Sequence, residues 1–379
     1  MMHNELEFHA FCLTDTGSRL DRFAAAIAAR VRPGDSVLDL GAGSGILSFL
    51  ACRAGARRVY AIEAGGSIEF ARLLAERHGF QDRIQFISQP STQVRLHARV
   101  ETIVGDIHDT FGLQRHGLGA LMDARDRFLA PGGTLIPCRI QLMTAPIEAP
   151  DHYQRTIDVW RQRVQGIDLS PLRSLAVHQP TAARIDPSQL LSPPVALTTI
   201  DLMRVTRPHV SGMSQSDVTR DGTLHGVCGC FVTTLADDVV MGNVPGDSET
   251  TNFAQAFFPI ESPLAIRTGD RVTIRLETHD GAATRWQVDV TRDGSSIGRF
   301  DHSMLHAEIL SMQALRKQAD DYRPSLTPLG AMERDLLDRF DGTHSAADLE
   351  SWLTTRAESV LPSAREAAAF LKQTIERCG

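Results

Sequence analysis

One segment constrains the fold of this chain more than any other, the stretch from Val37 to Glu63. It opens with a short apolar run, Val37-Leu38, of the kind that buried parallel strands have, and continues into a glycine turn. An apolar helix then starts at Ile46, and a second strand ends at Ile62, directly before Glu63. The order strand, glycine turn, helix, strand, carboxylate predicts a site for a nucleoside-type cofactor in a parallel α/β sheet.

The glycine spacing favours one cofactor class. A dinucleotide fingerprint has the pattern G-x-G-x-x-G, which lets the backbone approach a pyrophosphate at a helix N-terminus. Here the loop is G-A-G-S-G, and Ile46 stands where the third glycine of that fingerprint would be. An NAD-dependent oxidoreductase is therefore disfavoured. S-adenosylmethionine fits better, because its compact amino-acid part can lie against the glycines while Glu63 accepts hydrogen bonds from both ribose hydroxyls. The predicted cofactor-binding residues of this segment are Asp39, Gly41, Gly43, Gly45 and Glu63.

Composition excludes several other classes. The 379 residues suit two or three domains, and a net charge of −7 without a basic run gives no sign of nucleic-acid binding. The six cysteines form no CxxC pair, so neither a disulfide framework nor a metal site is indicated. No signal peptide and no run of 18 apolar residues is present, so we expect no membrane span and a cytoplasmic location.

The pattern of elements changes twice along the chain. Up to about residue 137, apolar periodicity predicts helices at 19–30, 68–78 and 118–129 that alternate with strands at 84–87 and 101–104. After a helical, proline-rich insertion at 151–173, β-branched runs separated by turns predict an antiparallel β domain. A third region has helical periodicity split at Asp341-Gly342-Thr343. The expected domains are 1–137, 138–322 and 323–379.

The order of these parts resembles the protein arginine methyltransferase family. The resemblance runs from about His9 to Arg299 and includes the motifs VLDLGAGSGILS and AGARRVYAIE, the PGG at 131–133, and TNFAQAFFPIESPLAIRTGD at 251–270. It implies an α/β fold in which a Rossmann-like methyltransferase sheet precedes an antiparallel β-barrel. It also implies a helical dimerisation arm at about 151–190, and hence a homodimer.

The segment after the fourth expected strand departs from the family pattern. Arginine methyltransferases hold the substrate guanidinium with two glutamates, which make paired contacts to the delocalised cation. In GDIHDTFGLQRHG, Asp106 takes the place of the first glutamate and Arg115 falls near the second. A fixed cation there would oppose an arginine substrate by about 1 to 4 kcal/mol. The resemblance implies a methyltransferase, and this departure from the family pattern predicts that its acceptor is not a standard protein arginine.

Further site residues follow from the resemblance. The family's Thr-His-Trp loop is Thr251-Asn252-Phe253 here, and the N-terminal aspartate that pairs with its histidine corresponds to Asp15. An N-terminal arginine that grips the cofactor carboxylate falls at Ser18 or one residue beyond, and we favour Arg19. Polar candidates for the adenine are Ser91 and Thr92.

The chemistry of the acceptor leaves two bases open. Methyl transfer from a sulfonium needs mainly a positioned, neutral nucleophile. Asp106 can orient an amine and take up its proton, and His108 is the alternative base. If the acceptor carries a carboxylate, Arg115 becomes its recognition group.

The C-terminal region resembles the small winged-helix domains that hold leader peptides in peptide-modifying pathways, such as the pyrroloquinoline-quinone peptide chaperone. This resemblance implies that the region binds a leader peptide. The alternative is that the region shapes the acceptor entrance or the oligomer. The expected function is methylation of nitrogen or oxygen on a peptide side chain or a small natural-product precursor. The alternative is a non-catalytic dimeric scaffold that keeps the cofactor fold.

Overall fold

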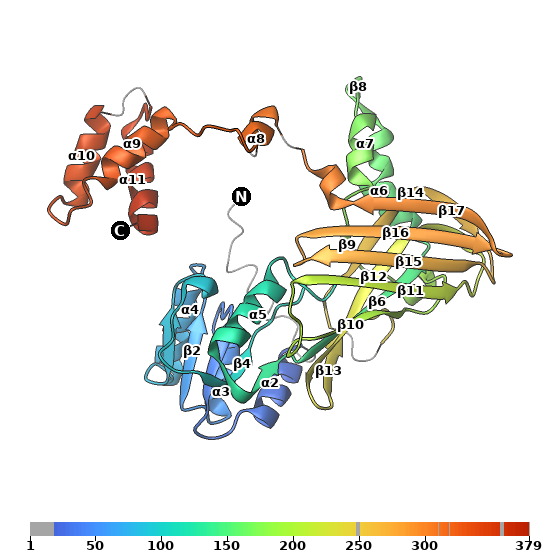
Figure 1. Cartoon of the computed structure of the whole chain (residues 1–379), viewed down its shortest axis with the longest axis horizontal. Coiled ribbons are helices and arrows are strands. Elements are labelled where there is room, and N and C mark those ends of the chain that lie inside the picture. The colour runs from blue at the N-terminus through green and yellow to red at the C-terminus, as the bar shows by residue number, and fades with distance from the viewer. Residues whose placement is uncertain (1–18, 248–250, 310, 318, 357–359, 379) are drawn as a thin grey trace. The chain divides into compact units, whose positions relative to one another are not determined.

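A parallel sheet of five strands organises the N-terminal part, in the order β3-β2-β1-β4-β5 (Figure 1). The structure is a computed structural model that describes residues 19–247, 251–309, 311–317, 319–356 and 360–378. The strands are β1 Ser36–Leu40, β2 Arg58–Ile62, β3 Ile84–Ile87, β4 Val100–Val104 and β5 Leu129–Ile136. The strand order reverses between β1 and β4, and the crevice outside the carboxyl ends of the strands at such a point is where open α/β sheets bind ligands.

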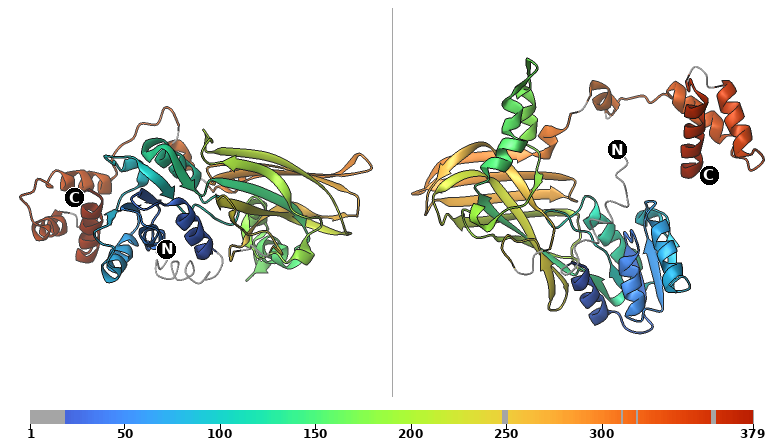
Figure 2. Two further views of the ribbon diagram at one scale, coloured as in Figure 1. Left: turned by 90° about the horizontal axis from the view of Figure 1, so that it is seen from below. Right: turned by 180° about the vertical axis from the view of Figure 1, so that it is seen from behind.

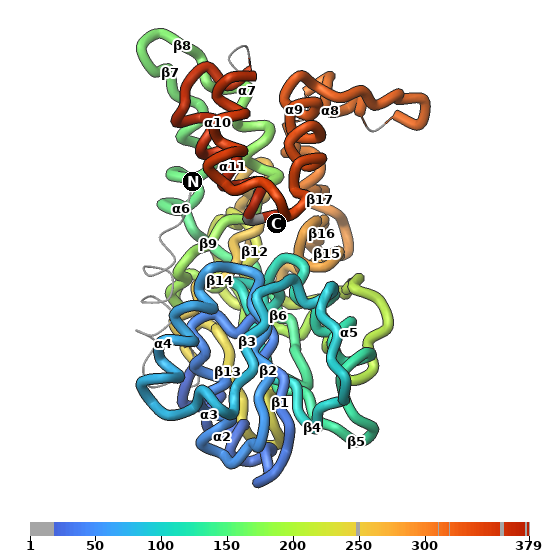
Figure 3. Tube along the Cα trace, turned by 90° about the vertical axis from the view of Figure 1, so that its left-hand side faces the viewer, coloured from blue at the N-terminus to red at the C-terminus, as the bar shows by residue number. Residues whose placement is uncertain are grey.

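Helices cover both faces of this sheet (Figure 3). One face packs against α2 Arg19–Arg30, α3 Ile46–Arg53 and α4 Ile68–His78, which share a hydrophobic core containing Phe23 and Ile27. The other face packs against α5 Gly117–Phe128 through Leu118, Leu121 and Phe128. Every residue of β1 is buried, which explains the apolar residues Val37, Leu38 and Leu40 on both faces of this strand.

Two antiparallel sheets follow, with their inner faces in one core (Figure 2). The six-stranded sheet has the order β10-β6-β12-β14-β9, with β13 paired to β12, and the four-stranded sheet has the order β11-β15-β16-β17. The bounds are β6 Arg139–Ile147, β9 Thr181–Ala183, β10 Val195–Asp201, β11 His209–Asp217, β12 Gly222–Ala236, β13 Val239–Gly242, β14 Gln255–Ile266, β15 Arg271–His279, β16 Ala283–Arg292 and β17 Ser295–Ser303. Phe258 of one sheet and Trp286 of the other meet with ring centroids 5.4 Å apart.

The parallel sheet and the six-stranded sheet are joined tightly. Only Pro137 and Cys138 separate β5 from β6. The β12–β13 hairpin reaches back, and its Leu235 and Met241 lie in the same core as Phe23 of α2. A residue at the end of β12 is therefore held firmly relative to the start of α2.

An arm of short elements projects from the antiparallel sheets (Figure 2). It comprises α6 Pro150–Thr156, η2 Asp158–Arg161, the hairpin of β7 Arg163–Val164 and β8 Ile167–Asp168, and α7 Ser170–Ala176. The side chains of Val164 and Ile167 at its tip are 51% and 65% exposed.

The chain divides into two units, Met1–Glu308 and Ile309–Gly379. The second contains α8 Met312–Lys317, α9 Pro328–Leu337, α10 Ala346–Arg356 and α11 Ala364–Cys378. The last three helices share a small core around Leu336, Leu353 and Leu371. No strand occurs among the residues of this unit that the structure describes, so its winged-helix character stays a prediction.

The predicted mixed α/β architecture is confirmed, with a parallel Rossmann-like sheet and antiparallel sheets. Closure of the antiparallel part into a barrel and the three expected domain limits remain predictions. The helix expected at 118–129 ends at Phe128, and Pro131-Gly132-Gly133 lies inside β5, across a register shift against β4. In the described ranges, no helix has both the length and the apolar composition needed to cross a bilayer.

Candidate functional site

The glycine loop between β1 and α3 has a backbone that only glycine adopts readily. Gly41, Gly43 and Gly45 have φ values of 74°, 51° and 81°. A Cβ on Gly45 would lie 2.8 Å from the Ala71 Cβ, whereas a Cβ on Gly41 would meet nothing within 4 Å. The loop thus packs closely against α4 on one side and leaves open space on the other.

Glu63 closes this loop from the end of β2. Its Oε2 accepts a hydrogen bond from the Gly43 N–H at 3.0 Å, and its Oε1 accepts one from the Gly65 N–H at 2.7 Å. Each carboxylate oxygen can accept a second hydrogen bond. Glu63 can therefore hold the glycine loop and still accept from two ligand hydroxyls.

Asp39 lies fully buried beneath the loop. Its Oδ2 accepts a hydrogen bond from the Ser48 hydroxyl at 2.7 Å, while its Oδ1 has no partner in the described structure. Burial raises the pKa of Asp39 to about 7, against the lowering effect of Ser48. A buried acceptor without a partner fits a ligand that brings a hydrogen-bond donor. The N–H groups of an amino acid's ammonium group could supply such a donor.

Two predicted residues with different roles meet in one ion pair. The guanidinium of Arg19, at the start of α2, donates to Oδ2 of Asp106, which follows β4. Arg19 also lies over the ring of Phe253, with 5.6 Å from its Cζ to the ring centroid. Burial opposes ionisation of Asp106, but the hydrogen bond from His108 and the charges of His108 and Arg19 outweigh it, so the pKa of Asp106 is lowered.

His108 is enclosed behind Asp106. Its Nδ1 is 2.8 Å from Asp106 Oδ1, and its Nε2 is 2.9 Å from the Thr233 hydroxyl of β12. Its ring stacks on Phe231 at a centroid distance of 5.3 Å and lies 6.4 Å from the ring of Phe253. Both nitrogens that could act as a base therefore already contact protein atoms.

The Thr251-Asn252-Phe253 loop contributes unequally. Thr251 is buried, and its backbone N–H and its hydroxyl both donate to the Gly242 carbonyl, which is a structural role. The backbone carbonyl of Asn252 accepts from Arg184 at 3.1 Å. Phe253 is the member that reaches the Arg19 and His108 side chains.

The other predicted residues lie apart from this cluster or outside the description. Arg115 is exposed, and its Nε donates to His116 at 3.3 Å. Ser91 and Thr92 lie in η1 Ser91–Gln93, where the Ser91 carbonyl accepts from Arg127 and Thr92 is exposed. Asp15 and Ser18 fall outside the described residues.

Sequence reasoning missed Ser48 and Thr233. Ser48 lies in α3 and Thr233 lies 125 residues from His108 along the chain, in a strand of another sheet. Ser48 is the last residue of the motif VLDLGAGSGILS, but the motif alone assigns it no contact with Asp39. No local motif marks Thr233, because its contact with His108 exists only in the folded chain.

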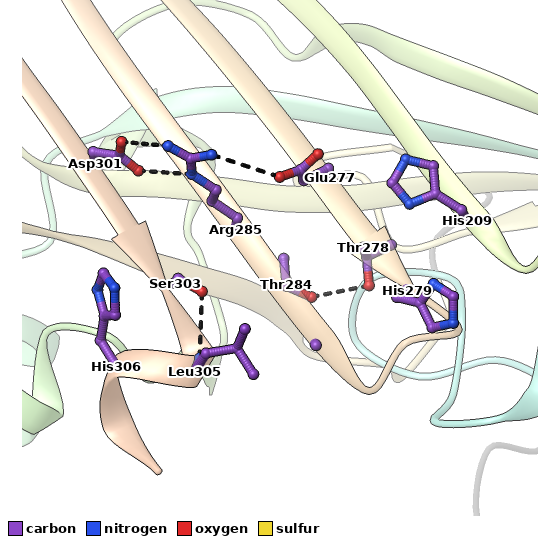
Figure 4. A pocket seen from close by; sticks show the side chains of 11 residues that line it. His209, Glu277, Thr278, His279, Thr284, Arg285, Asp301, Ser303, Leu305 and His306 are labelled. Carbon is purple, nitrogen blue, oxygen red and sulfur yellow. Dashed lines mark hydrogen bonds and ion pairs between the residues drawn. The ribbon is translucent and has the colours of Figure 1, made fainter. Parts of the chain in front are cut away.

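Two pockets lie in the antiparallel part. One of about 480 Å³ extends over the outer side of the four-stranded sheet, around Glu277, Arg285 and Asp301, and contains none of the predicted residues (Figure 4). A smaller one of about 160 Å³ lies between Phe111, Phe258 and Met304, beside the loop that follows His108. No cluster of three or more potential metal ligands occurs in the part of the chain that the structure describes.

Comparisons with known proteins agree with this arrangement. The family model described as arginine methyltransferase oligomerization subdomain matches residues 139–293, and the model of ribosomal protein L11 methyltransferase (PrmA) matches residues 22–138. The probable protein arginine N-methyltransferase 6 of Arabidopsis thaliana is 34% identical over 172 residues, which are 44% of this chain and 39% of that protein. The probable histone-arginine methyltransferase CARM1 of Oryza sativa subsp. indica is 31% identical over 280 residues, 70% of this chain and 53% of that protein. The chain thus spans about half or less of the length of these curated relatives.

Solved structures show the same fold. The Trypanosoma brucei PRMT1 enzyme-prozyme heterotetrameric complex with AdoHcy matches with a TM-score of 0.67 at 23% identity, over 76% of this chain and 94% of that chain. Arabidopsis thaliana protein arginine methyltransferase 10 matches with a TM-score of 0.64 at 19% identity, over 76% and 95%.

The parallel sheet, the glycine loop and the carboxylates at its edge lie in the region that is similar to a methyltransferase family model. The chain is similar in sequence to ribosomal protein L11 methyltransferase over residues 22–138 and to the arginine methyltransferase oligomerization subdomain over residues 139–293, and its fold is like that of solved arginine methyltransferases.

Proposed function

We propose that the chain is an S-adenosylmethionine-dependent methyltransferase. The observation that carries the proposal is the donor site: an open glycine loop, the Glu63 carboxylate at its rim, and the unpartnered Oδ1 of Asp39 beneath it. Relatives named as arginine methyltransferases, and a neighbour solved with AdoHcy, support the same cofactor. Nothing supports the scaffold alternative.

The residues of this chain would hold the cofactor at its amino-acid part and at its nucleoside. Asp39 accepts from the amino group, Arg19 pairs with the carboxylate, and Glu63 accepts from the ribose hydroxyls. Ser91 and Thr92 remain candidates for the adenine. S-adenosylmethionine supplies a methyl group that is already activated on a sulfonium, so the protein needs chiefly to orient a nucleophile and exclude water.

Calorimetry with S-adenosylhomocysteine tests the donor site. Glu63→Ala should weaken binding by about 1 to 3 kcal/mol, because two ligand hydroxyls lose a charged acceptor. Glu69→Ala is the control, since Glu69 is an exposed carboxylate on α4 that pairs with Arg72. Failure of the unmodified protein to bind at micromolar concentration would refute the proposal, and equal binding by the Glu63 variant would show that the ribose lies elsewhere.

For the acceptor, we propose nitrogen or oxygen of a peptide side chain or small natural-product precursor other than a standard protein arginine. Asp106 is paired with both Arg19 and His108, so little uncompensated negative charge remains for a guanidinium. Arg115 occupies the position where the family pattern has its second glutamate. Asp106 orients a neutral nucleophile, and Thr251, Asn252 and Phe253 border its approach.

Arg115→Glu is the probe for this acceptor class. If Arg115 opposes arginine or recognises a carboxylate, the variant should gain turnover on arginine peptides or lose turnover on the natural acceptor. Both are measured by transfer of a radiolabelled methyl group, with Arg95→Glu, a charge reversal on the loop after η1, as the control. Unchanged turnover on both substrates would remove the charge argument.

The arm at about 151–190 supports a homodimer, because it lies within the matched oligomerization subdomain and carries exposed aliphatic residues at its tip.

The helical C-terminal unit would bind a leader peptide, and exposed Leu329 and Leu337 of α9 support a peptide-binding surface there. Deletion after Arg323 should then abolish methylation of a leader-bearing peptide and spare the core peptide. Equal loss on both peptides would assign this unit to the acceptor entrance or the oligomer.

A further inference from the structure

The hydrogen bond between His108 and Asp106 places a proton on one particular ring nitrogen. Asp106 is an ionised carboxylate and can only accept, so the proton lies on Nδ1, which donates across 2.8 Å. The Nε2 atom is 2.9 Å from the Thr233 hydroxyl, which donates to it when the imidazole is neutral and accepts from it when the ring is doubly protonated. The tautomer with Nδ1–H satisfies both contacts at once, whereas the tautomer with Nε2–H would place a lone pair against the carboxylate.

The residues packed around the His108 ring hold it in one orientation. The side chain of His108 has no exposed surface. Phe231 stacks on one face at 5.3 Å with 20° between the ring planes, and Phe23 approaches edge-on at 6.5 Å. Thr233 and Phe231 are both in β12, at alternate positions of one strand face. A single strand therefore supplies both the hydrogen bond and the stacking surface.

We infer that Thr233 and His108 are positioning residues, which hold Asp106 and, through it, the Arg19 guanidinium at the cofactor edge of the parallel sheet. The inference rests on the proposed function. Asp106 Oδ1 is bound by His108 and Oδ2 by Arg19, so turning the carboxylate breaks one contact or the other. The order Thr233, His108, Asp106, Arg19 is a continuous line of contacts from the six-stranded sheet to α2.

This assignment separates His108 from the role of general base. A base needs a nitrogen lone pair that faces the acceptor, and the only lone pair of the Nδ1–H tautomer is directed at Thr233. Loss of the imidazole should therefore act by releasing Asp106. Loss of the Thr233 hydroxyl should have the same kind of effect, although no hydrogen bond joins Thr233 to Asp106 among the described residues, because the buried Nε2 would lose its hydrogen-bond partner.

Two variants of Thr233 test the inference. Thr233→Val keeps the shape but removes the hydroxyl, and Thr233→Ser keeps the hydroxyl. The control is Thr278→Val, which removes another buried threonine hydroxyl, one that pairs with Thr284 at 3.0 Å away from this line of contacts. If Thr233 only stabilises the fold, Thr233→Val and Thr278→Val should behave alike.

The first readout is the imidazole nitrogen spectrum of His108 in the full-length protein, assigned with the His108→Phe variant. We expect the Nδ1–H tautomer in the unmodified protein, Thr233→Ser and Thr278→Val, and a changed spectrum in Thr233→Val. The second readout is S-adenosylhomocysteine affinity, which should fall about fivefold or more in Thr233→Val and in His108→Phe, and stay within about twofold in the serine and control variants.

An Nε2–H tautomer in the unmodified protein would overturn the inference, as would equal affinities of Thr233→Val and Thr278→Val. If the unmodified protein does not bind S-adenosylhomocysteine, the proposed function fails. The tautomer and its response to Thr233→Val still decide whether these residues position Asp106.

Discussion

Three carboxylates lie around the cofactor edge of the parallel sheet, and each has a different environment. Asp39 is buried with one oxygen unpartnered, Asp106 is held between a guanidinium and an imidazole, and Glu63 accepts from backbone amides. The environment alone therefore gives the three carboxylates different properties. Asp39 titrates near neutral pH, Asp106 stays ionised in its ion pair, and Glu63 holds the glycine loop through backbone hydrogen bonds.

If Asp39 binds the cofactor as proposed, we predict that cofactor affinity depends on pH. Its pKa of about 7 in the folded chain lies above the value of 3.8 for an exposed aspartate, so the folded state retains the proton and stability falls as pH rises from about 4 to 7. An ammonium group that donates to Oδ1 needs the ionised form. We expect S-adenosylhomocysteine to bind roughly tenfold more tightly at pH 8 than at pH 6.

Calorimetry across this range measures the effect, with Asp39→Asn as the matched variant, which has no proton to lose. Its affinity should be weaker at pH 8 and nearly constant with pH. A pH dependence that survives in the asparagine variant would assign the titrating group to another residue.

Residue-scale prediction from sequence succeeded in placing the glycines, Asp39 and Glu63 together, because one β-α-β unit contains them all. It placed Asp106 and His108 in the same loop but not the ion pair with Arg19. That pair joins residues 87 positions apart, and the sequence carries no periodicity from which such a contact could be inferred.

At the scale of elements, the start of α3 combines conformational and steric demands. Gly45 has φ 81°, and a Cβ there would lie 2.8 Å from the Ala71 Cβ of α4. Helices α3 and α4 therefore approach each other at a point where only a hydrogen atom fits.

The parallel strands were predictable as short apolar runs. In contrast, β17, SSIGRFDHS, was not, because it lies largely exposed at the edge of its sheet and lacks a regular apolar alternation.

Gly45→Ala should destabilise the chain more than an alanine at another left-handed glycine. Gly79, which ends α4, has φ 73° and nothing within 4 Å of an added Cβ, so Gly79→Ala isolates the backbone cost of about 1 to 2 kcal/mol. Gly45→Ala adds the clash with Ala71, for a further cost of about 1 to 3 kcal/mol. Urea unfolding of both variants measures the difference, and equal free energies of unfolding would show that α4 moves away freely.

At the scale of the whole molecule, the arm offers the test of assembly. Val164 and Ile167 are paired across the β7–β8 tip and both are exposed, and neighbouring exposed aliphatic residues favour an interaction surface. Ile167→Asp combined with Val164→Asp should convert the proposed dimer to a monomer in analytical ultracentrifugation. Leu73→Asp is the control, because Leu73 is 66% exposed on α4, far along the chain from the arm. An unchanged mass of the arm variant would place the interface elsewhere.

At residue 137, the expected domain limit, the chain passes from the parallel sheet to the antiparallel sheets, but the two parts stay packed against each other. Two residues link β5 to β6, and the β12–β13 hairpin shares a core with α2. Sequence could not reveal this, because a return contact of that kind leaves no mark near the boundary.

The short link between β5 and β6 also bears on how such a protein can be recombined. A graft that exchanged the antiparallel part at residue 137 would replace Leu235, Ala236 and Met241, which complete the hydrophobic core beneath α2. The same graft would carry away Thr233 and leave His108 behind. A chimera joined at residue 137 should therefore be less stable than one in which both sheets come from the same parent.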